Sequence, residues 1–297
     1  MALKFVIAWE EEQKRDETAD PYLTRLLSGL HKYGAEAFLI PAAYAQEKKL
    51  AEILKENALD PTEGLVLAAT DHFLEQAAEL PIATVGFLNP AFPGQSLSVA
   101  QILVEGFEEV DFYFLERIYN RKHKIPWRVI DTKRCYLREM TEEDLDALYE
   151  LYAGTDMTKY MEPLYADRRE EAEYMQAYIA SQYYYYGYGM WVVIEQATGK
   201  LIGRAGLDNR KIHGKIELEM GYAIAADRHR QGYATEVCLA IIHYARQFLE
   251  FPRINCLVNR ENEASVQLLL KLGFSQKEEL EIDGERMQRY LYTFPEE

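Results

Sequence analysis

Asp227-Arg-His-Arg-Gln-Gly-Tyr-Ala-Thr-Glu236 is a cationic stretch with one glycine, and it lies between two apolar patterns of this 297-residue chain. The preceding residues 216–224 alternate between apolar and acidic side chains and then turn apolar, which predicts a β-strand. The residues that follow carry apolar side chains at helical spacing, namely Val237, Ala240, Ile241, Tyr244 and Phe248. The stretch is therefore predicted to lead from a strand into the N-terminus of a long amphipathic helix.

A helix N-terminus of this kind is suited to bind a phosphate group. Its first backbone N–H groups have no partner within the helix, and the helix macrodipole is positive at that end. Gly232 allows the backbone to approach a ligand closely, and Ala234 keeps a nearby side chain small. A glycine-containing loop is a weak signal by itself, because a plain helix start has the same pattern.

Two further motifs follow in the sequence, Asn262-Glu-Ala-Ser265 and Lys271-Leu-Gly-Phe274, and an apolar strand pattern at residues 254–258 precedes them. Together with the Gln231-Gly-Tyr-Ala234 loop, these motifs resemble the GNAT superfamily of acyl-CoA N-acyltransferases. The resemblance is strongest to the subgroup that includes RimJ and RimL, which acetylate protein N-termini. It covers residues 130 to about 294.

The resemblance implies that acetyl-CoA is the cosubstrate and that its acetyl group passes to a primary amine by direct attack in a ternary complex. It also implies a set of cofactor-binding residues, namely Tyr222, Ala223, Ile224, His229, Arg230, Gln231, Gly232, Tyr233, Ala234, Thr235 and Asn262. One position departs from the family pattern, because His229 stands where the family usually has Gln or Arg. Arg228 and Arg230 keep the loop cationic, but a solvated basic face is the alternative interpretation.

Three residues are candidates for the chemistry of acetyl transfer. Glu217 and Glu219 share one face of the predicted strand because they are two residues apart. The resemblance favours Glu219 as the general base, with Glu217 in reserve; the alternative is a solvated sheet face with no catalytic role. It also favours Ser265 as the group that protonates the leaving thiolate, while Asn262 is expected at least to cap the helix that contains Ser265.

Aromatic and acidic residues predict an acceptor site for a cationic amine. Aromatic faces attract cations, and nearby carboxylates add negative charge. The expected acceptor-binding residues are Tyr160, Glu162, Tyr165, Tyr188 and Trp191, with Tyr186 as a further aromatic face. The alternative is that the tyrosines pack a helix against the sheet. Whether the acceptor is a small-molecule amine or a protein or peptide amine stays open.

The first part of the chain alternates short apolar runs with helical patterns, which predicts βαβ units and a parallel sheet. We expect an α/β fold class, with a parallel-sheet domain at residues 1–125 and a GNAT mixed-sheet domain of α+β character at residues 126–297. Within the first domain, helical patterns are predicted to start at residues 47 and 107, and residues 89–94 are predicted to form a loop. The linker is predicted around residues 124–127, followed by a strand at residues 129–139 and a helix that opens with a capping box of Thr141 and Asp144.

The first domain has a faint likeness to haloacid-dehalogenase-type phosphatases, mainly in Thr70-Asp71 after a strand. It lacks the carboxylate nucleophile of that family, because its first strand ends Ala8-Trp9-Glu10. A degenerate domain kept for binding, regulation or stability is therefore favoured. Asp71 is expected to be a helix N-cap.

The composition excludes several classes of function. A net charge of −16 makes a nucleic-acid partner improbable and favours a cationic acceptor. The cysteines Cys135, Cys238 and Cys256 have no paired spacing, which predicts reduced core residues of a cytoplasmic protein. The six histidines lack metal-ligand spacing, so no metal is expected. No apolar run is long enough to span a bilayer, so no membrane partner is expected, and a homodimer is left open.

A rival function from another class is a non-catalytic acyl-CoA-binding sensor, in which the first domain gives the output. The two functions differ at Glu219 and Ser265, which a sensor would not need.

Overall fold

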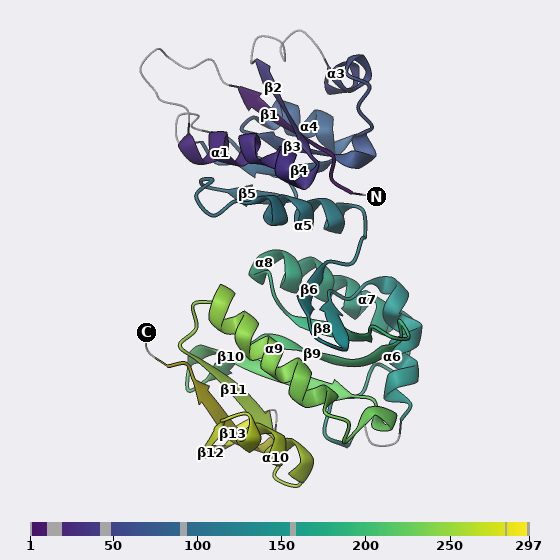
Figure 1. The fold of residues 1–297 in the computed structure, drawn as a ribbon, viewed down its shortest axis with the longest axis vertical. Helices are drawn as coiled ribbons and strands as arrows, with labels where there is room; N and C mark the ends of the chain where they lie inside the picture. Colours follow the sequence, from purple (N-terminus) through teal and green to yellow (C-terminus); the bar gives the residue numbers. More distant parts are fainter. Residues whose placement is uncertain are drawn as a thin grey trace. The chain divides into compact units, whose positions relative to one another are not determined.

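The first unit of the chain, Met1–Trp127, is a five-stranded sheet with helices on both faces (Figure 1). The computed structural model describes residues 2–10, 20–41, 49–89, 94–154, 159–282 and 284–295. All neighbouring strands of this sheet are parallel, in the order β2-β1-β3-β4-β5. The strands are β1 (Phe5–Glu10), β2 (Glu36–Pro41), β3 (Gly64–Ala68), β4 (Ala83–Phe87) and β5 (Ile102–Val104). The predicted α/β class is confirmed for this part of the chain.

Alternation along the strands divides the core of this unit into two layers. Val6 on β1 packs with helices α1 (Pro21–Gly29) and α5 (Phe112–Lys122), whereas Ile7 packs with α3 (Leu50–Glu56) and α4 (Asp71–Ala78). A parallel sheet covered on both faces needs apolar residues on both sides of each strand, as the fully buried β3 shows.

Several details of the first unit differ from expectation. The helix predicted from residue 107 begins at Phe112, because Asp111 accepts a hydrogen bond from Phe114 N and caps it. Asp71 is not an N-cap, since that position belongs to Thr70; its carboxylate instead accepts the backbone N–H groups of Ser96 and Leu97.

The likeness to haloacid-dehalogenase-type phosphatases is not confirmed. Some expectations fall outside the described residues, namely those for residues 47–48, for 90–93 and for the side chains of Trp9 and Glu10.

The second unit, Arg128–Glu297, is built on an eight-stranded mixed sheet. Its order is β12-β13-β11-β10-β9-β8-β7-β6, and β10 and β11 form its one parallel pair among the described strands. The strands are β6 (Arg128–Asp131), β7 (Cys135–Arg138), β8 (Met190–Glu195), β9 (Leu201–Ile212), β10 (Lys215–Ile224), β11 (Arg253–Val258), β12 (Ser275–Ile282) and β13 (Glu285–Thr293). The mixed sheet predicted for this half of the chain is confirmed.

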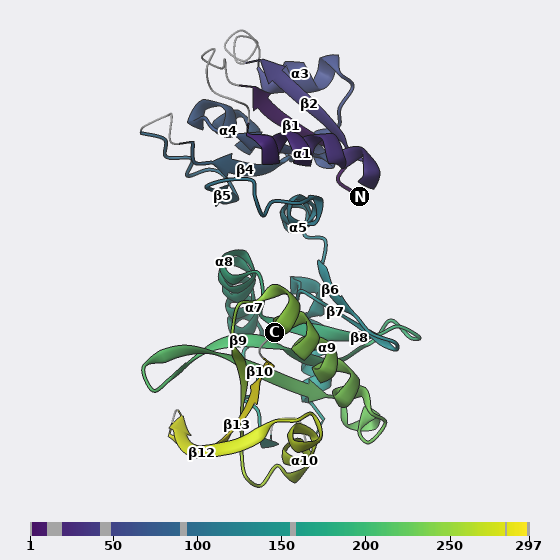
Figure 2. The same cartoon turned by 60° about the vertical axis from the view of Figure 1, so that its left-hand side comes forward.

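Helices cover both faces of the mixed sheet. On one face, Trp191 of β8 packs against Tyr244 of α9 (Tyr233–Phe248), and α10 (Glu263–Lys271) lies beside the β12–β13 hairpin (Figure 2). On the other face, Arg204 of β9 donates a hydrogen bond to Tyr152 of α6 (Leu145–Tyr152). The remaining helices are α7 (Arg168–Tyr178) and α8 (Tyr184–Tyr186), separated by a π-helical turn.

The strand expected at residues 129–139 is wrong in one respect, since it is a hairpin of β6 and β7. Thr132 turns the chain, because its backbone N–H donates to Cys135 O and its hydroxyl oxygen accepts the Cys135 N–H. The helix that follows begins with the expected capping box of Thr141 and Asp144. Among the described residues, no helix combines the length and apolar character that a membrane crossing requires.

Candidate active site

The candidate site lies at a gap between strands β10 and β11 of the mixed sheet. The parallel strands β10 and β11 share just two ladder pairs, Leu218 with Ile254 and Glu219 with Asn255. Beyond these pairs β10 continues to Ile224 and has no strand partner on that side among the described residues. The outer edge of β10 therefore offers backbone groups that a sheet would normally use.

Backbone direction along β10 decides which groups face the gap. Ala225 N donates to Ile202 O of β9, and successive residues of a strand point to opposite edges. Consistent with this alternation, Ile224 O accepts a hydrogen bond from His229 Nε2 at 2.8 Å on the other edge. The N–H groups of Tyr222 and Ile224 therefore face the gap, whereas the N–H of Ala223 faces β9.

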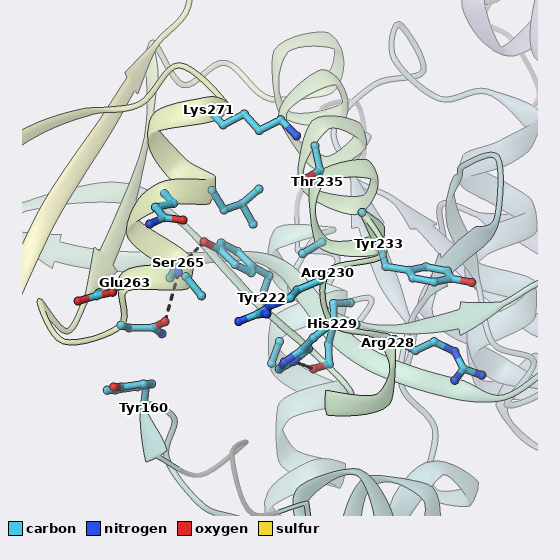
Figure 3. Close-up of a pocket in the computed structure, with 18 of the residues that line it drawn as sticks. Tyr160, Tyr222, Arg228, His229, Arg230, Tyr233, Thr235, Glu263, Ser265 and Lys271 are labelled. Atoms are coloured by element: carbon cyan, nitrogen blue, oxygen red, sulfur yellow. Dashed lines mark hydrogen bonds between the residues drawn. The ribbon is translucent and has the colours of Figure 1, made fainter.

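A groove of about 850 Å³ lies beside this edge, between β10 and the N-termini of α9 and α10 (Figure 3). Every expected cofactor-binding residue lines it except Gln231. The Gln231 side chain instead donates to Asp227 O at 2.8 Å, within the loop before α9. The sequence analysis did not assign Lys271 to this site, although its side chain reaches into the groove from the end of α10.

The N-terminus of α9 opens into the groove. Gly232 occupies the N-cap with φ +83°, a left-handed conformation that favours glycine, and no side chain caps the helix. Glu236 N donates to Gly232 O, so the N–H groups of residues 233–235 precede the first helical hydrogen bond. Because the macrodipole is positive here, the open N–H groups form a site for an anion.

Side chains of the β6–β7 turn bind the loop before α9, and we call this set of Thr132, Arg134 and Glu236 the Arg134 clamp. Arg134 donates to Glu236 Oε2 at 2.7 Å and to Gln231 O at 2.9 Å. Thr132 adds a hydrogen bond of 2.8 Å to Glu236 Oε1. Sequence reasoning missed this clamp because its partners lie about 100 residues apart; the acidic residue in the first turn of α9 was the one available signal.

A second buried carboxylate, Glu195 at the end of β8, holds the other side of the loop. It accepts hydrogen bonds from Arg228 at 3.0 Å and from the Tyr233 hydroxyl at 2.7 Å. The Arg228 hydrogen bond and then that of Tyr233 lower the pKa of Glu195 to about 2. Arg228 and Tyr233 thus point away from the groove in Figure 3, so Arg230 is the arginine whose side chain remains available to a ligand's phosphate.

A smaller cavity of about 150 Å³ contains Glu219. Glu219 lies opposite Asp208 of β9, whereas Tyr222 lies opposite Ala205, on the same face as Trp191. The groove and the small cavity therefore belong to opposite faces of the sheet. They share five lining residues, namely Tyr160, Met161, Tyr222, Asn262 and Ser265, so they join through the gap.

Ser265 lies where the two cavities join. Its hydroxyl is 2.6 Å from the Tyr222 hydroxyl, and its N–H donates to Asn262 Oδ1 at 3.2 Å, so Asn262 is the N-cap of α10 (Figure 3). Across the junction, the Tyr160 hydroxyl donates to Glu261 O at 3.0 Å. Hydroxyl groups from β10, from α10 and from the segment that contains Tyr160 therefore lie at the junction of the two cavities.

The structure separates the two candidate carboxylates. Glu219 faces the small cavity, and its burial raises its pKa although Arg210 Nε donates to it at 2.7 Å. Glu217 lines neither cavity; Arg253 binds it and lowers its pKa, and Asn255 donates to it at 3.1 Å. Neither carboxylate is on a solvated face, and the reserve role for Glu217 does not fit this geometry.

Comparison with known proteins identifies the second unit. Residues 134–275 match the acetyltransferase (GNAT) domain family. The "Uncharacterized N-acetyltransferase YoaA" of Bacillus subtilis (strain 168) is 30% identical over 164 residues, which cover 55% of this chain and 88% of that protein. The chain belongs to the GNAT acetyltransferase family.

A second relative of this GNAT protein is the "Uncharacterized N-acetyltransferase p20" of Bacillus licheniformis. It is 30% identical over 160 residues, which cover 54% of this chain and 89% of that protein. Among solved structures, a putative GNAT-family acetyltransferase from Bordetella pertussis aligns with 20% identity and a TM-score of 0.47, covering 56% of this chain and 99% of that chain.

The aromatic and acidic residues expected to bind the acceptor do not come together in the GNAT domain. Trp191 is fully buried against α9, because strand alternation places it on the face opposite Glu219. Tyr188 is buried as well, and its hydroxyl donates to Asn209 Oδ1 at 2.8 Å. Three exposed residues, Glu162, Tyr165 and Tyr186, line neither cavity, and Tyr160 alone of the expected set lines both.

Two further features of the GNAT protein concern cysteine and metal chemistry. Cys135, Cys238 and Cys256 are free and buried, as the sequence predicts for reduced core residues. In the described ranges, no three His, Cys, Asp or Glu side chains are grouped so as to hold a metal ion.

Proposed function

We propose that this protein transfers an acetyl group from acetyl-CoA to a primary amine by direct attack in a ternary complex, with Glu219 as base and Ser265 as acid. The observation that carries the proposal is the junction of two cavities from opposite sheet faces at Ser265 and Tyr222. One cavity is large enough for an extended donor, and the other is small and contains a buried carboxylate.

The groove has the groups that coenzyme A would require. Its diphosphate carries negative charge, which the open N–H groups of residues 233–235 and the Arg230 side chain would bind. Its pantetheine arm carries amides, which would pair with the free edge of β10 at Tyr222 and Ile224. A donor held in this way would place its thioester at the gap, beside Ser265.

The proposed reaction moves two protons. Glu219 accepts one from the ammonium, so that the neutral nitrogen can attack the thioester carbon. The N–C bond forms, the C–S bond breaks, and the leaving thiolate takes the Ser265 hydroxyl proton. The second proton of the amine restores Ser265, and the first passes from Glu219 to solvent. A β10 N–H facing the gap would stabilise the oxygen while it carries negative charge.

The rival function, a non-catalytic acyl-CoA sensor, would need the groove but not the small cavity. The carboxylate of Glu219 in the adjoining small cavity therefore favours transfer. Whether the acceptor is a small molecule or the N-terminus of a protein depends on what the small cavity admits, and the comparisons with uncharacterized relatives do not name an acceptor.

Thiol release from acetyl-CoA across a panel of primary amines tests the proposal. We expect amine-stimulated release that depends on Glu219, together with an acetylated amine identified by mass spectrometry. Calorimetry with CoA measures the donor site separately. Tight CoA binding without amine-stimulated release would support the sensor instead.

A further inference from the structure

The small cavity combines apolar side chains and one carboxylate with hydroxyl and amide groups. Its uncharged polar side chains are those of Tyr160, Tyr222, Asn262 and Ser265, which also line the groove at the junction, and of Asn259. Four half-buried side chains contribute to its wall, Met161, Met190, Leu257 and Met287. They come from four different segments of the second unit, so the apolar lining is a property of the assembled fold. Glu219 is the one charged side chain among the described residues that line the cavity.

Met190 and Leu257 lie beside Glu219 on the same sheet face. Met190 is opposite Gly206, which is opposite Gly221, so two glycines leave room for the methionine to cross the strands. A methyl group added to Gly221 would lie 3.3 Å from Met190 Sδ, which shows that the thioether covers this glycine. Alternation along β11 places Leu257 on the face of Asn255, which contacts Glu217. The carboxylate is therefore flanked by apolar groups.

The cavity can pair with one ammonium. Arg210 pairs with Glu219, and Asp208 lies opposite Glu219 on the neighbouring strand. Asp208 does not line the cavity and accepts hydrogen bonds from Gln182 at 3.1 Å and from Asn209 N at 2.7 Å. Among the described residues that line the cavity, Glu219 is therefore the one carboxylate that can meet an ammonium, and no second lining carboxylate is present for a distal cation.

We propose, on the basis of the function proposed above, that the acceptor is a monocationic primary amine whose substituent is apolar, rather than a polyamine or other polycation. The ammonium lies at Glu219, and the apolar substituent contacts the methionine side chains. Methionine is flexible and polarizable, so these walls adapt to aliphatic or aromatic groups of different shape. Each buried methylene strengthens binding by about four-fold, whereas a buried second ammonium without a partner weakens it.

Hexylamine and 1,6-diaminohexane form a matched pair that tests this inference. They have the same chain of six carbons and differ at the far end, where one carries a methyl group and the other an ammonium. We expect kcat/KM for hexylamine to exceed that for 1,6-diaminohexane by at least about ten-fold. We also expect kcat/KM to rise from propylamine to hexylamine. Equal values, or a preference for the diamine, would overturn the inference.

Substitutions in the cavity test whether its walls set this preference. Met287→Glu adds a carboxylate for a distal ammonium and should reduce the hexylamine preference to less than about two-fold. Leu239→Glu is the matched control, because it adds the same charge at an exposed position of α9 and should keep the preference. Met190→Gln removes apolar surface without adding charge and should weaken hexylamine more than propylamine.

Binding measured on the CoA-loaded protein separates this inference from the proposed reaction. If neither amine stimulates thiol release while hexylamine binds more tightly than the diamine by calorimetry, acetyl transfer is wrong and the apolar acceptor class is supported. If thiol release occurs and the diamine is preferred, acetyl transfer stands and the apolar acceptor class is wrong.

Discussion

The hydroxyl oxygen of Tyr222 on β10 lies 2.6 Å from the hydroxyl oxygen of Ser265 on α10, at the junction of the two cavities. Burial raises the pKa of Tyr222, so its phenol keeps its proton. When Tyr222 donates this hydrogen bond, the single hydrogen of the Ser265 hydroxyl is free to point at the leaving thiolate. Tyr222 thus positions the group that is proposed to act as the acid.

Tyr222→Phe is expected to lower kcat by about ten-fold, as the loss of one hydrogen bond would produce, with little change in the KM for acetyl-CoA. Ser265→Ala should lower kcat at least as much. The double variant should be no slower than Ser265→Ala alone, because Tyr222 acts through Ser265. Steady-state thiol release measures all three. Tyr136→Phe on β7 is the control, and additive losses would contradict the positioning role.

The carboxylates Glu217 and Glu219 should differ in what their removal changes. Glu219→Gln is expected to lower kcat by about 10²–10⁴ with little effect on acetyl-CoA affinity. Glu217→Gln removes the carboxylate that pairs with Arg253, so it should lower the melting temperature more than the turnover number per folded molecule. Kinetics and thermal unfolding on both variants distinguish the two roles. Normal turnover by Glu219→Gln would remove it as the base.

The proposed role of Glu219 as the base also predicts how kcat depends on pH. Burial raises the pKa of Glu219 above its ordinary value of 4.5, and a base must be ionised to act. The wild-type kcat should therefore rise with pH on its acidic limb with a midpoint above 4.5.

Loss of the Arg134 clamp should weaken binding of the diphosphate of acetyl-CoA and leave binding of the rest of the donor unchanged. Arg134→Ala removes the side-chain hydrogen bonds to Gln231 O and Glu236 Oε2, so the loop before α9 loses part of its support from the β6–β7 turn, while Thr132 still binds Glu236. We expect the KM for acetyl-CoA to rise by about ten-fold while that for S-acetylpantetheine, which has no diphosphate, stays within two-fold. Equal effects on the two donors would mean that the whole groove has been disturbed. Arg169→Ala, an exposed site on α7, is the control.

Glu195 should stabilise the fold in a defined pH range. Its folded-state pKa of about 2 lies below the ordinary value of 4.5, so its ion pair contributes stability above pH 4.5 that is lost as the pH falls toward 2. Glu195→Gln should therefore lower the melting temperature by about 5 °C at pH 7 and by progressively less below pH 4.5. Thermal unfolding of both proteins between pH 3 and pH 7 measures this difference. A difference independent of pH would contradict the assignment.

Residues 128–297 should fold and bind CoA when expressed alone. Their core cluster contains residues of the second unit alone, as do both cavities. Circular dichroism and calorimetry with CoA measure folding and binding, and the full chain is the reference. An insoluble fragment would show that the first unit covers part of this core.

Much of the groove beside β10 could be predicted from local sequence. The loop before α9 has a glycine that adopts positive φ, a cationic flank and a following apolar helix pattern, all within residues 227–248. Asn262 could be predicted as an N-cap, because its residue type and its spacing to Ser265 are both visible in the local sequence. Such features depend on neighbouring residues along the chain, which a single sequence displays.

The acceptor side could not be predicted in the same way, because it depends on strand register. Trp191 and Met190 are adjacent in sequence but face opposite sides of the sheet, and their pairing with β9 decides which one meets Glu219. The turn within residues 129–139 is different in kind, because it is local: the polar stretch Asp131-Thr-Lys-Arg134 contains it, and Thr132 bonds to Cys135 three residues on. Long-range pairing decided the facing of Met190 and Trp191, and no local pattern records it.

Because β10 and β11 share just two ladder pairs, the eight-stranded sheet consists of two smaller sheets, β6–β10 and β11–β13, that meet at a short seam. A donor whose amides pair with the free edge of β10 would occupy the place of a missing strand. Acetyl-CoA would then be a structural member of the sheet during each catalytic cycle, and release of CoA would reopen the seam. Hydrogen bonds that hold the cosubstrate would in this way also hold the two parts of the sheet together beyond the two ladder pairs.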